Sequence, residues 1–170
     1  MRITKKFYIR PATETAPLLL GKFLCRNAEG NVIKRRITET EIYFGEDDTA
    51  CHARSGVTRR TWPLYEQGGI AYVYLCYGIH NLFNVVTGEK GFPQAVLIRG
   101  VEGFDGPGKL TKHMKIDRSL NAVCLVGSNE IWLEDDGFLP KFNATKRIGI
   151  DYASEHDRNR LWRFVAEDIT

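Results

Sequence analysis

Residues 32–44 read VIKRRITETEIYF, and this stretch predicts a long β-strand. Side chains alternate between the two faces of a strand, so its odd-numbered positions share one face. Ile33 and Ile37 indicate that this face is at least partly buried, yet it also carries Glu39 and Glu41. For one carboxylate, an ion pair with a nearby arginine is as good an explanation as a functional role. For both together a functional site is the better explanation, unless a bulge interrupts the strand.

The segments around this strand predict a single α+β domain over 1–170. A loop rich in charge and glycine covers 45–69, and residues 70–77 and 82–87 predict a hairpin with a tight turn at Gly78. Because most predicted strands follow one another without crossover helices, we expect a curved, largely antiparallel sheet with flanking helices and a protruding β-hairpin. The other predicted elements are a helix over 11–20 with Pro17 in an early turn and Gly21 at its end, strands over 95–101, 130–133, 146–150 and 162–165, a helix over 106–115, and a short helix opened by the capping box at 154–157.

Composition and charge fit a soluble protein with a polyanionic partner. The chain has 170 residues, 43% of them hydrophobic and 26% charged, which suits one domain with its own core. A net charge of +3 permits nucleic-acid binding, and the clustering of basic residues favours it. No apolar run could span a bilayer and no signal peptide is recognisable, so we expect a cytoplasmic, nucleoid-associated protein, or a nuclear one in a eukaryote. The basic clusters lie at 34–36, 59–60, 109–118 and 158–163.

Neither the cysteines nor the histidines predict a metal site. The four cysteines form no CxxC pair and are expected to be reduced thiols. The four histidines are scattered without the spacing of metal ligands. We therefore expect neither a metal ion nor another cofactor.

Two further motifs suggest contacts to DNA. Tyr77 lies beside the hairpin turn; core packing is the common role of strand tyrosines, but an aromatic side chain at a hairpin tip can wedge between bases. Residues 103–110, GFDGPGKL, nearly match a phosphate-binding loop, but the last position is a leucine without the hydroxyl that magnesium needs. We therefore reject a nucleotide triphosphatase. Lys109, at a helix N-terminus, is expected to contact a DNA phosphate. Arg59 and Arg60, from the basic cluster at 59–60, are also expected to contact DNA.

Short motifs occur in a fixed order along nearly the whole chain. They are PA at 11–12, LLGK at 19–22, TETEIY at 38–43, ACHAR at 50–54, YVYLCYG at 72–78, Asn84, VLIR at 96–99, GPGKL at 106–110, RIGI at 147–150 and WRF at 162–164. Each motif is weak alone, but the ordered set resembles the alkyladenine (3-methyladenine) DNA glycosylases, which are enzymes of alkylation repair. The resemblance implies a compact α/β domain without a metal, and we expect it to act as a monomer.

The resemblance also implies roles for single residues. Glu41 would be the general base that activates the attacking water, and Arg99 and the main-chain carbonyl of Ile148 would help to hold that water. Glu39 has no implied role, and we expect it to pair with a basic residue. The other implied roles are stacking on one face of the flipped base by Tyr43 and on the other by His52 and Tyr74, hydrogen bonds to the base edge from the backbone of Ala50–His52, exclusion of the guanine 2-amino group by Asn84, and filling of the gap in the duplex by Tyr77.

The implied reaction is hydrolysis of the N-glycosidic bond of a purine flipped out of duplex DNA, which leaves an abasic site. The expected substrates are alkylated or deaminated purines of the 3-methyladenine, hypoxanthine and ethenoadenine class. A non-catalytic damaged-DNA-binding domain would keep Tyr77 and the basic patches but would not need Glu41. A bifunctional lyase would need an activated lysine, and no lysine here lies in an apolar context.

Three features depart from the pattern of the resembled family. Only residues 100–105 separate the Arg99 strand from the following helix, where relatives often have a longer segment. Thr61 stands where asparagine is usual, and Ile79 stands where the best-known relatives have methionine. None of the implied catalytic positions is changed.

Overall fold

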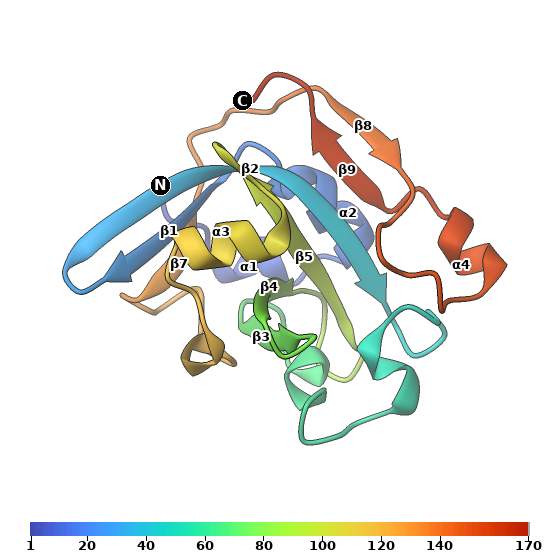
Figure 1. Cartoon of the computed structure of the whole chain (residues 1–170). Coiled ribbons are helices and arrows are strands. Elements are labelled where there is room, and N and C mark those ends of the chain that lie inside the picture. Colours follow the sequence, from blue (N-terminus) through green and yellow to red (C-terminus); the bar gives the residue numbers. More distant parts are fainter. Residues whose placement is uncertain (170) are drawn as a thin grey trace.

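Nine strands form one antiparallel sheet in the computed structural model, which describes residues 1–169 (Figure 1). The main strands lie in the order β3-β4-β5-β2-β1-β7, and β9 also pairs with β2, β8 with β9 and β6 with β5. The predicted α+β class with an antiparallel sheet is therefore confirmed. The strands are β1 (Phe23–Ala28), β2 (Asn31–Phe44), β3 (Ala71–Cys76), β4 (His80–Val86), β5 (Gln94–Val101), β6 (Phe104–Asp105), β7 (Ile131–Glu134), β8 (Phe142–Thr145) and β9 (Arg163–Ala166).

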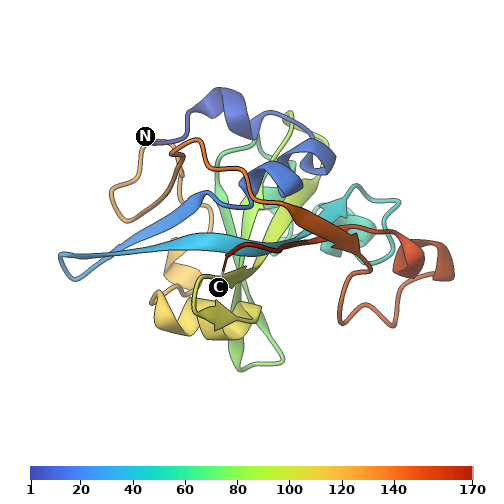
Figure 2. The ribbon, with the colours of Figure 1, turned by 90° about the horizontal axis from the view of Figure 1, so that it is seen from above.

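Short helices cover both faces of this sheet. Figure 2 shows α1 and α2 on one face and α3 on the other. Within residues 1–169, none of them is long and apolar enough to cross a membrane. The helices are α1 (Lys5–Tyr8), α2 (Ala12–Leu19), α3 (Pro107–His113) and α4 (Glu155–Asn159), with 3₁₀ turns η1 (His52–Ser55), η2 (Trp62–Tyr65) and η3 (Arg118–Leu120).

The main hydrophobic core joins the helices to the central strands. Leu19 of α2 and Leu110 of α3 belong to the same buried cluster as Ile42 of β2 and Ile98 of β5. Full burial of a leucine or isoleucine side chain stabilises a fold by about 1.5–3 kcal/mol. The core therefore fixes β2 and β5, the two strands that carry the candidate site.

Strand β2 is irregular where its two glutamates stand. Across β2 and β5 the pairing shifts twice, so that Thr38 on one strand and Arg99 on the other have no direct partner. The alternation assumed from the sequence therefore breaks at Thr38, and Ile33 and Ile37 do not mark the face on which the glutamates lie. Bulges of this kind change the direction of side chains and are common next to active sites.

The prediction of a strand over 146–150 is wrong, because β8 ends at Thr145 and the chain beyond it is irregular. Beyond it, the Arg147 guanidinium turns inward to Asp48, and the Ile148 N–H donates to a side-chain carboxylate. These groups contact the site instead of continuing the strand ladder. The other predicted strands and helices are present, with ends displaced by one or two residues.

Two details near the N-terminus differ from the sequence prediction. Pro17 is near the end of α2 rather than in an early turn, because Pro11 takes the N-cap position and starts the helix. Strand β1 was not predicted, although Glu29 and Gly30, both with positive φ, form the tight turn that joins it to β2. A Gly-containing turn between two apolar runs was the signal that could have identified this hairpin.

Candidate active site

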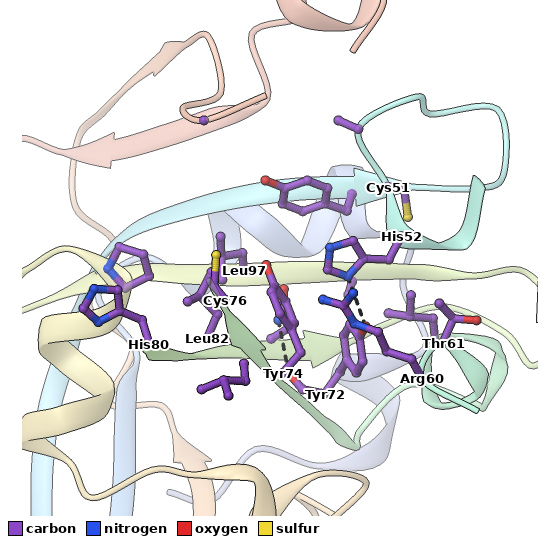
Figure 3. A pocket seen from close by; sticks show the side chains of 18 of the residues that line it. Cys51, His52, Arg60, Thr61, Tyr72, Tyr74, Cys76, His80, Leu82 and Leu97 are labelled. Carbon is purple, nitrogen blue, oxygen red and sulfur yellow. Dashed lines mark hydrogen bonds between the residues drawn. The ribbon is translucent and has the colours of Figure 1, made fainter. Parts of the chain in front are cut away.

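A cleft of about 1010 Å³ opens between β2, β5, the β3–β4 hairpin, the η1 loop and the segment after β8. Figure 3 shows how aromatic and basic side chains from these elements point into it. Glu41 is fully buried and hydrogen-bonds three of the lining residues, whereas Arg59 is exposed and outside the lining. The other residues that were expected to bind the base or the DNA, or to hold the water, line the cleft: Tyr43, Ala50, His52, Arg60, Tyr74, Tyr77, Asn84, Arg99, Lys109 and Ile148.

Donor groups surround the carboxylate of Glu41, whose side chain is 0% exposed. The Tyr43 hydroxyl donates to Oε1 at 3.1 Å, and Arg99 Nη1 lies 3.4 Å from the same oxygen. The backbone N–H of Ile148 donates to Oε2 at 2.7 Å. The expected role of Ile148 was through its carbonyl, so its amide adds a contact that the sequence did not indicate.

Burial raises the pKa of Glu41 above its ordinary value, against the opposing effects of Arg99, the Ile148 amide and Tyr43. Burial disfavours the charged form, and donors to the carboxylate favour it. The ionised carboxylate is therefore a stronger proton acceptor than an exposed glutamate. It is suited to take a proton from water.

One wall of the cleft is made of rings. The centroids of His52 and Tyr74 are 4.5 Å apart, and those of Tyr72 and Tyr74 are 5.4 Å apart (Figure 3). His52 Nδ1 and the Tyr72 hydroxyl are 3.1 Å apart, and the Arg60 guanidinium lies 5.1 Å from the centre of the Tyr74 ring. Tyr43 lines the same cleft from β2. The site thus offers flat apolar surfaces of the kind on which bases stack.

The imidazole of His52 is neutral at pH 7. Burial is the main cause that lowers its pKa to about 4, and the nearby charge of Arg60 lowers it further. A neutral ring does not repel a positively charged ligand. His52 therefore adds no positive charge to this wall, where Arg60 is already charged.

The backbone at Ala50 is already engaged by the chain's own side chains. Its N–H donates to Asp48 Oδ1 at 3.1 Å, and its carbonyl accepts from the Tyr152 hydroxyl at 2.9 Å. A carbonyl oxygen has two lone pairs, so one stays available to a ligand. Of the two Ala50 groups, only the carbonyl can bond a base edge without losing its present partner.

A buried ion pair supports this part of the site. Arg147 donates to both oxygens of Asp48, at 2.7 and 2.9 Å, and both side chains are 0% exposed. The guanidinium also donates to the Ile42 carbonyl, and Asp48 accepts from the Phe44 N–H. The pair thus ties the end of β2 to the segment that carries the Ile148 amide.

Asn84 stands on β4 with its side chain fixed. It is 3% exposed, and its Nδ2 donates to the carbonyl of Tyr72, its cross-strand neighbour, at 3.1 Å. The side chain therefore presents a rigid polar wall at the cleft.

The tip of the β3–β4 hairpin carries two exposed apolar side chains. Tyr77 is 89% exposed and Ile79 is 72% exposed. The alternative that Tyr77 packs in the core is therefore wrong. Tyr77 also has φ 51°, a left-handed conformation that is uncommon for a bulky residue. Strained backbone at an exposed aromatic residue makes Tyr77 a candidate functional residue.

Basic and hydroxyl side chains complete the rim. Lys109 is exposed in the first turn of α3 and lines the cleft. Thr61 is buried; its hydroxyl accepts from the Thr58 N–H and donates to the Gly56 carbonyl, both at 2.9 Å. The Thr61 side chain thus closes the loop over 56–61.

Sequence reasoning missed several residues that shape the site. Tyr72 is two positions before Tyr74 on β3 and therefore lies on the same face of the strand. This spacing could have indicated that Tyr72, like Tyr74, lies beside His52. Asp48, Arg147 and Tyr152 act across long sequence separations, and no local signal indicates them. Among residues 1–169, no group of three or more His, Cys, Asp or Glu side chains is placed to hold a metal ion.

Comparison with known proteins identifies the family to which the chain belongs. The model of the family "Methylpurine-DNA glycosylase (MPG)" matches residues 6–105 and 103–170. A Borreliella burgdorferi protein named "Putative 3-methyladenine DNA glycosylase" is 47% identical over 95% of this chain and 94% of its own length. Relatives of the same name from Methanocella arvoryzae and Psychrobacter cryohalolentis are 42% and 39% identical, over 95% and 98% of this chain and 90% and 92% of their own. The chain belongs to the methylpurine-DNA glycosylase family.

Proposed function

We propose that this protein is a monofunctional DNA glycosylase of base-excision repair that flips an alkylated or deaminated purine out of duplex DNA and hydrolyses its N-glycosidic bond. The observation that carries the proposal is Glu41, a buried carboxylate held by Arg99, Tyr43 and Ile148 beside an aromatic cleft. Membership of a DNA glycosylase family supports it. The protein would act as a monomer.

The chemistry needs a carboxylate and a positioned water. The bond between the purine nitrogen and C1′ breaks with its electron pair leaving on the base, through an oxocarbenium-like state. The water oxygen bonds to C1′, and Glu41 takes the water proton. Arg99 lies close enough to favour the negative charge of the carboxylate until that transfer. The products are an abasic site and the free base: a cationic alkylated base leaves neutral, and a neutral base leaves as an anion that takes up a proton from solvent.

The aromatic cleft would hold the flipped purine. The base would stack between Tyr43 on one side and Tyr74 and His52 on the other. Because the pKa of His52 is lowered to about 4, its ring stays neutral and tolerates a cationic methylated base. The gap left in the duplex would be filled by Tyr77 at the hairpin tip.

A non-catalytic DNA-binding domain of the same fold is the alternative from a different class. Such a domain has no use for a carboxylate whose burial raises its pKa, since burying an ionised group costs free energy. A bifunctional lyase would need an activated amine. Within the described chain Lys109 is the one lysine that lines the cleft, and it is exposed. The expectation that no lysine lies in an apolar context is wrong for Lys22, which is 3% exposed, but Lys22 is paired with Asp135 outside the cleft lining.

A panel of duplexes, each with a single damaged purine, tests the proposal. We expect release of free base from at least one of the 3-methyladenine, hypoxanthine and ethenoadenine duplexes, with the abasic strand intact until alkali is added. Tight binding of every duplex without base release would support the binding domain instead. Strand cleavage without alkali would show that a lyase nucleophile is present.

Asn84→Ser is expected to widen the range of bases that are excised. If the Asn84 side chain blocks the guanine 2-amino group, the smaller serine should admit guanine-derived bases and keep hypoxanthine. Rates on matched hypoxanthine and guanine-derived duplexes measure the change. If the side chain only satisfies the Tyr72 carbonyl, the variant will lose thermal stability and keep the same substrates.

Lys109→Ala is expected to weaken binding equally for damaged and undamaged duplexes. Loss of one phosphate contact should make the slope of the logarithm of the binding constant against the logarithm of the salt concentration less negative by about 0.9. The matched control is Lys90→Ala, because Lys90 is paired with Glu66, lies in none of the basic clusters and does not line the cleft. Equal slopes for Lys109→Ala and wild type would show that Lys109 does not contact a DNA phosphate.

A further inference from the structure

Glu39 is a mostly buried carboxylate to which the proposed chemistry gives no role. Its side chain is 12% exposed, and it precedes Glu41 by two positions on β2. Its Oε1 accepts from Arg99 Nε at 3.0 Å and also from the guanidinium of Arg163 on β9. Pairing of Glu39 with a basic residue is therefore confirmed. The four side chains alternate in charge in the order Arg163, Glu39, Arg99 and Glu41.

Distances show that Arg99 is held more closely by Glu39 than by Glu41. Arg99 Nε lies 3.0 Å from Glu39, whereas Nη1 lies 3.4 Å from Glu41. An arginine without its first partner can turn two nitrogens to one carboxylate and form a bidentate pair. Such a pair would occupy both oxygens of Glu41 and weaken it as a proton acceptor.

The fold provides a specific place for Glu39. Arg99 is the extra residue on β5, so its side chain leaves the regular alternation of that strand. The next residue is Gly100, at which an added Cβ would lie 2.7 Å from Thr38 Oγ1 and 3.3 Å from Glu39 Cβ. A larger residue at position 100 would therefore collide with Thr38 and press on Glu39, so this position keeps the space that Glu39 occupies beside Arg99.

We propose that Glu39 is a positioning residue, which holds Arg99 by its Nε edge and prevents it from closing a two-point ion pair on Glu41. The inference rests on the proposed function, because it takes Glu41 as the base that accepts the proton of water. Glu39 does not contact the substrate in this scheme.

The charges around Glu41 give the direction of the effect. Arg99 and the more distant Arg147 favour its ionised form, and Glu39 opposes it. Arg163 stands opposite Glu41 on β9, but its side chain is paired with Glu39. Removing the charge of Glu39 removes a repulsion and frees both arginines, so the pKa of Glu41 should fall.

The test compares Glu39→Gln with wild type by NMR titration of the Glu41 carboxyl carbon and by single-turnover base release across pH. We expect the pKa of Glu41 and the acid limb of the rate profile to move down by about one pH unit. The rate above that limb should fall about three- to tenfold, because a weaker base accepts the proton less readily. The dissociation constant for lesion DNA should stay unchanged.

Asp136→Asn is the matched control, because it removes one carboxylate charge from the Arg36 pair away from the cleft. It should leave the pKa of Glu41 unchanged. If Glu39→Gln does not fold, Glu39→Asp keeps the charge but withdraws it from Arg99, and should lower the pKa of Glu41 by less. A folded variant in which this pKa is unchanged or raised overturns the proposal. Failure of wild type to release any base would refute the proposed function, and the NMR titration would still decide the role of Glu39.

Discussion

Replacing Glu41 by Gln is expected to remove base release and to leave folding and lesion binding intact. The single-turnover rate constant should fall on the order of 10²-fold or more, the loss expected when a general base is removed. The amide oxygen can still accept the Ile148 N–H, but it cannot take a proton from water. Release of hypoxanthine from a duplex with enzyme in excess measures the loss.

The pH dependence follows from the same carboxylate. Burial raises the pKa of Glu41 above 4.5, so base release by wild type should rise with pH through this raised value. The contribution of Glu41 to the free energy of unfolding has the opposite pH dependence. It is fully present below the pKa that Glu41 has in the unfolded chain, and it is lost as pH rises through the raised pKa of the folded protein. At neutral pH Glu41→Gln should therefore not lower the melting temperature. A variant that melts like wild type and releases base at a near-normal rate contradicts the assignment.

Tyr77→Ser is expected to impair base flipping rather than bond cleavage. Flipping costs a few kcal/mol of stacking and pairing, and an aromatic ring in the vacated space offsets part of that loss. Removing the ring should lower the flipping equilibrium by roughly 1–3 kcal/mol, or about 5- to 150-fold. Fluorescence of a base analogue at the lesion reports the flipped fraction.

Two comparisons separate this effect from general damage. Because Tyr77 is 89% exposed, its loss should not change the melting temperature. The penalty should be large for a lesion in a duplex and small for the same lesion in a single strand, if the enzyme acts there. Leu139→Ser removes a 66% exposed apolar side chain outside the cleft and should affect neither. A stable Tyr77→Ser variant that flips the base as well as wild type would exclude the wedge.

Much of the fold could be predicted because local patterns and tertiary structure agree. The Gly78 hairpin and the helix before Gly21 each have a turn or end signal that the structure keeps, and the 32–44 strand is present although its alternation breaks at Thr38. The ordered motifs also predicted residues from distant parts of the chain that the structure gathers around one cleft.

What could not be predicted depends on contacts between distant parts of the chain. The paired bulge at Thr38 and Arg99 is a property of two strands together, so alternation along one strand could not show it. The strand expected over 146–150 failed because Arg147 is needed at Asp48, far away in sequence. The engagement of the Ala50 carbonyl by Tyr152 likewise joins two loops.

A crystal structure of the Glu41→Gln variant on a duplex with one damaged purine tests the central claim most directly. The account predicts that the purine lies outside the helix, between the Tyr43 ring and the rings of His52 and Tyr74. The sugar C1′ should lie beside position 41, and Tyr77 should fill the gap in the duplex. A purine that stays stacked in the helix, with the aromatic cleft empty and Tyr77 away from the duplex, would contradict the account.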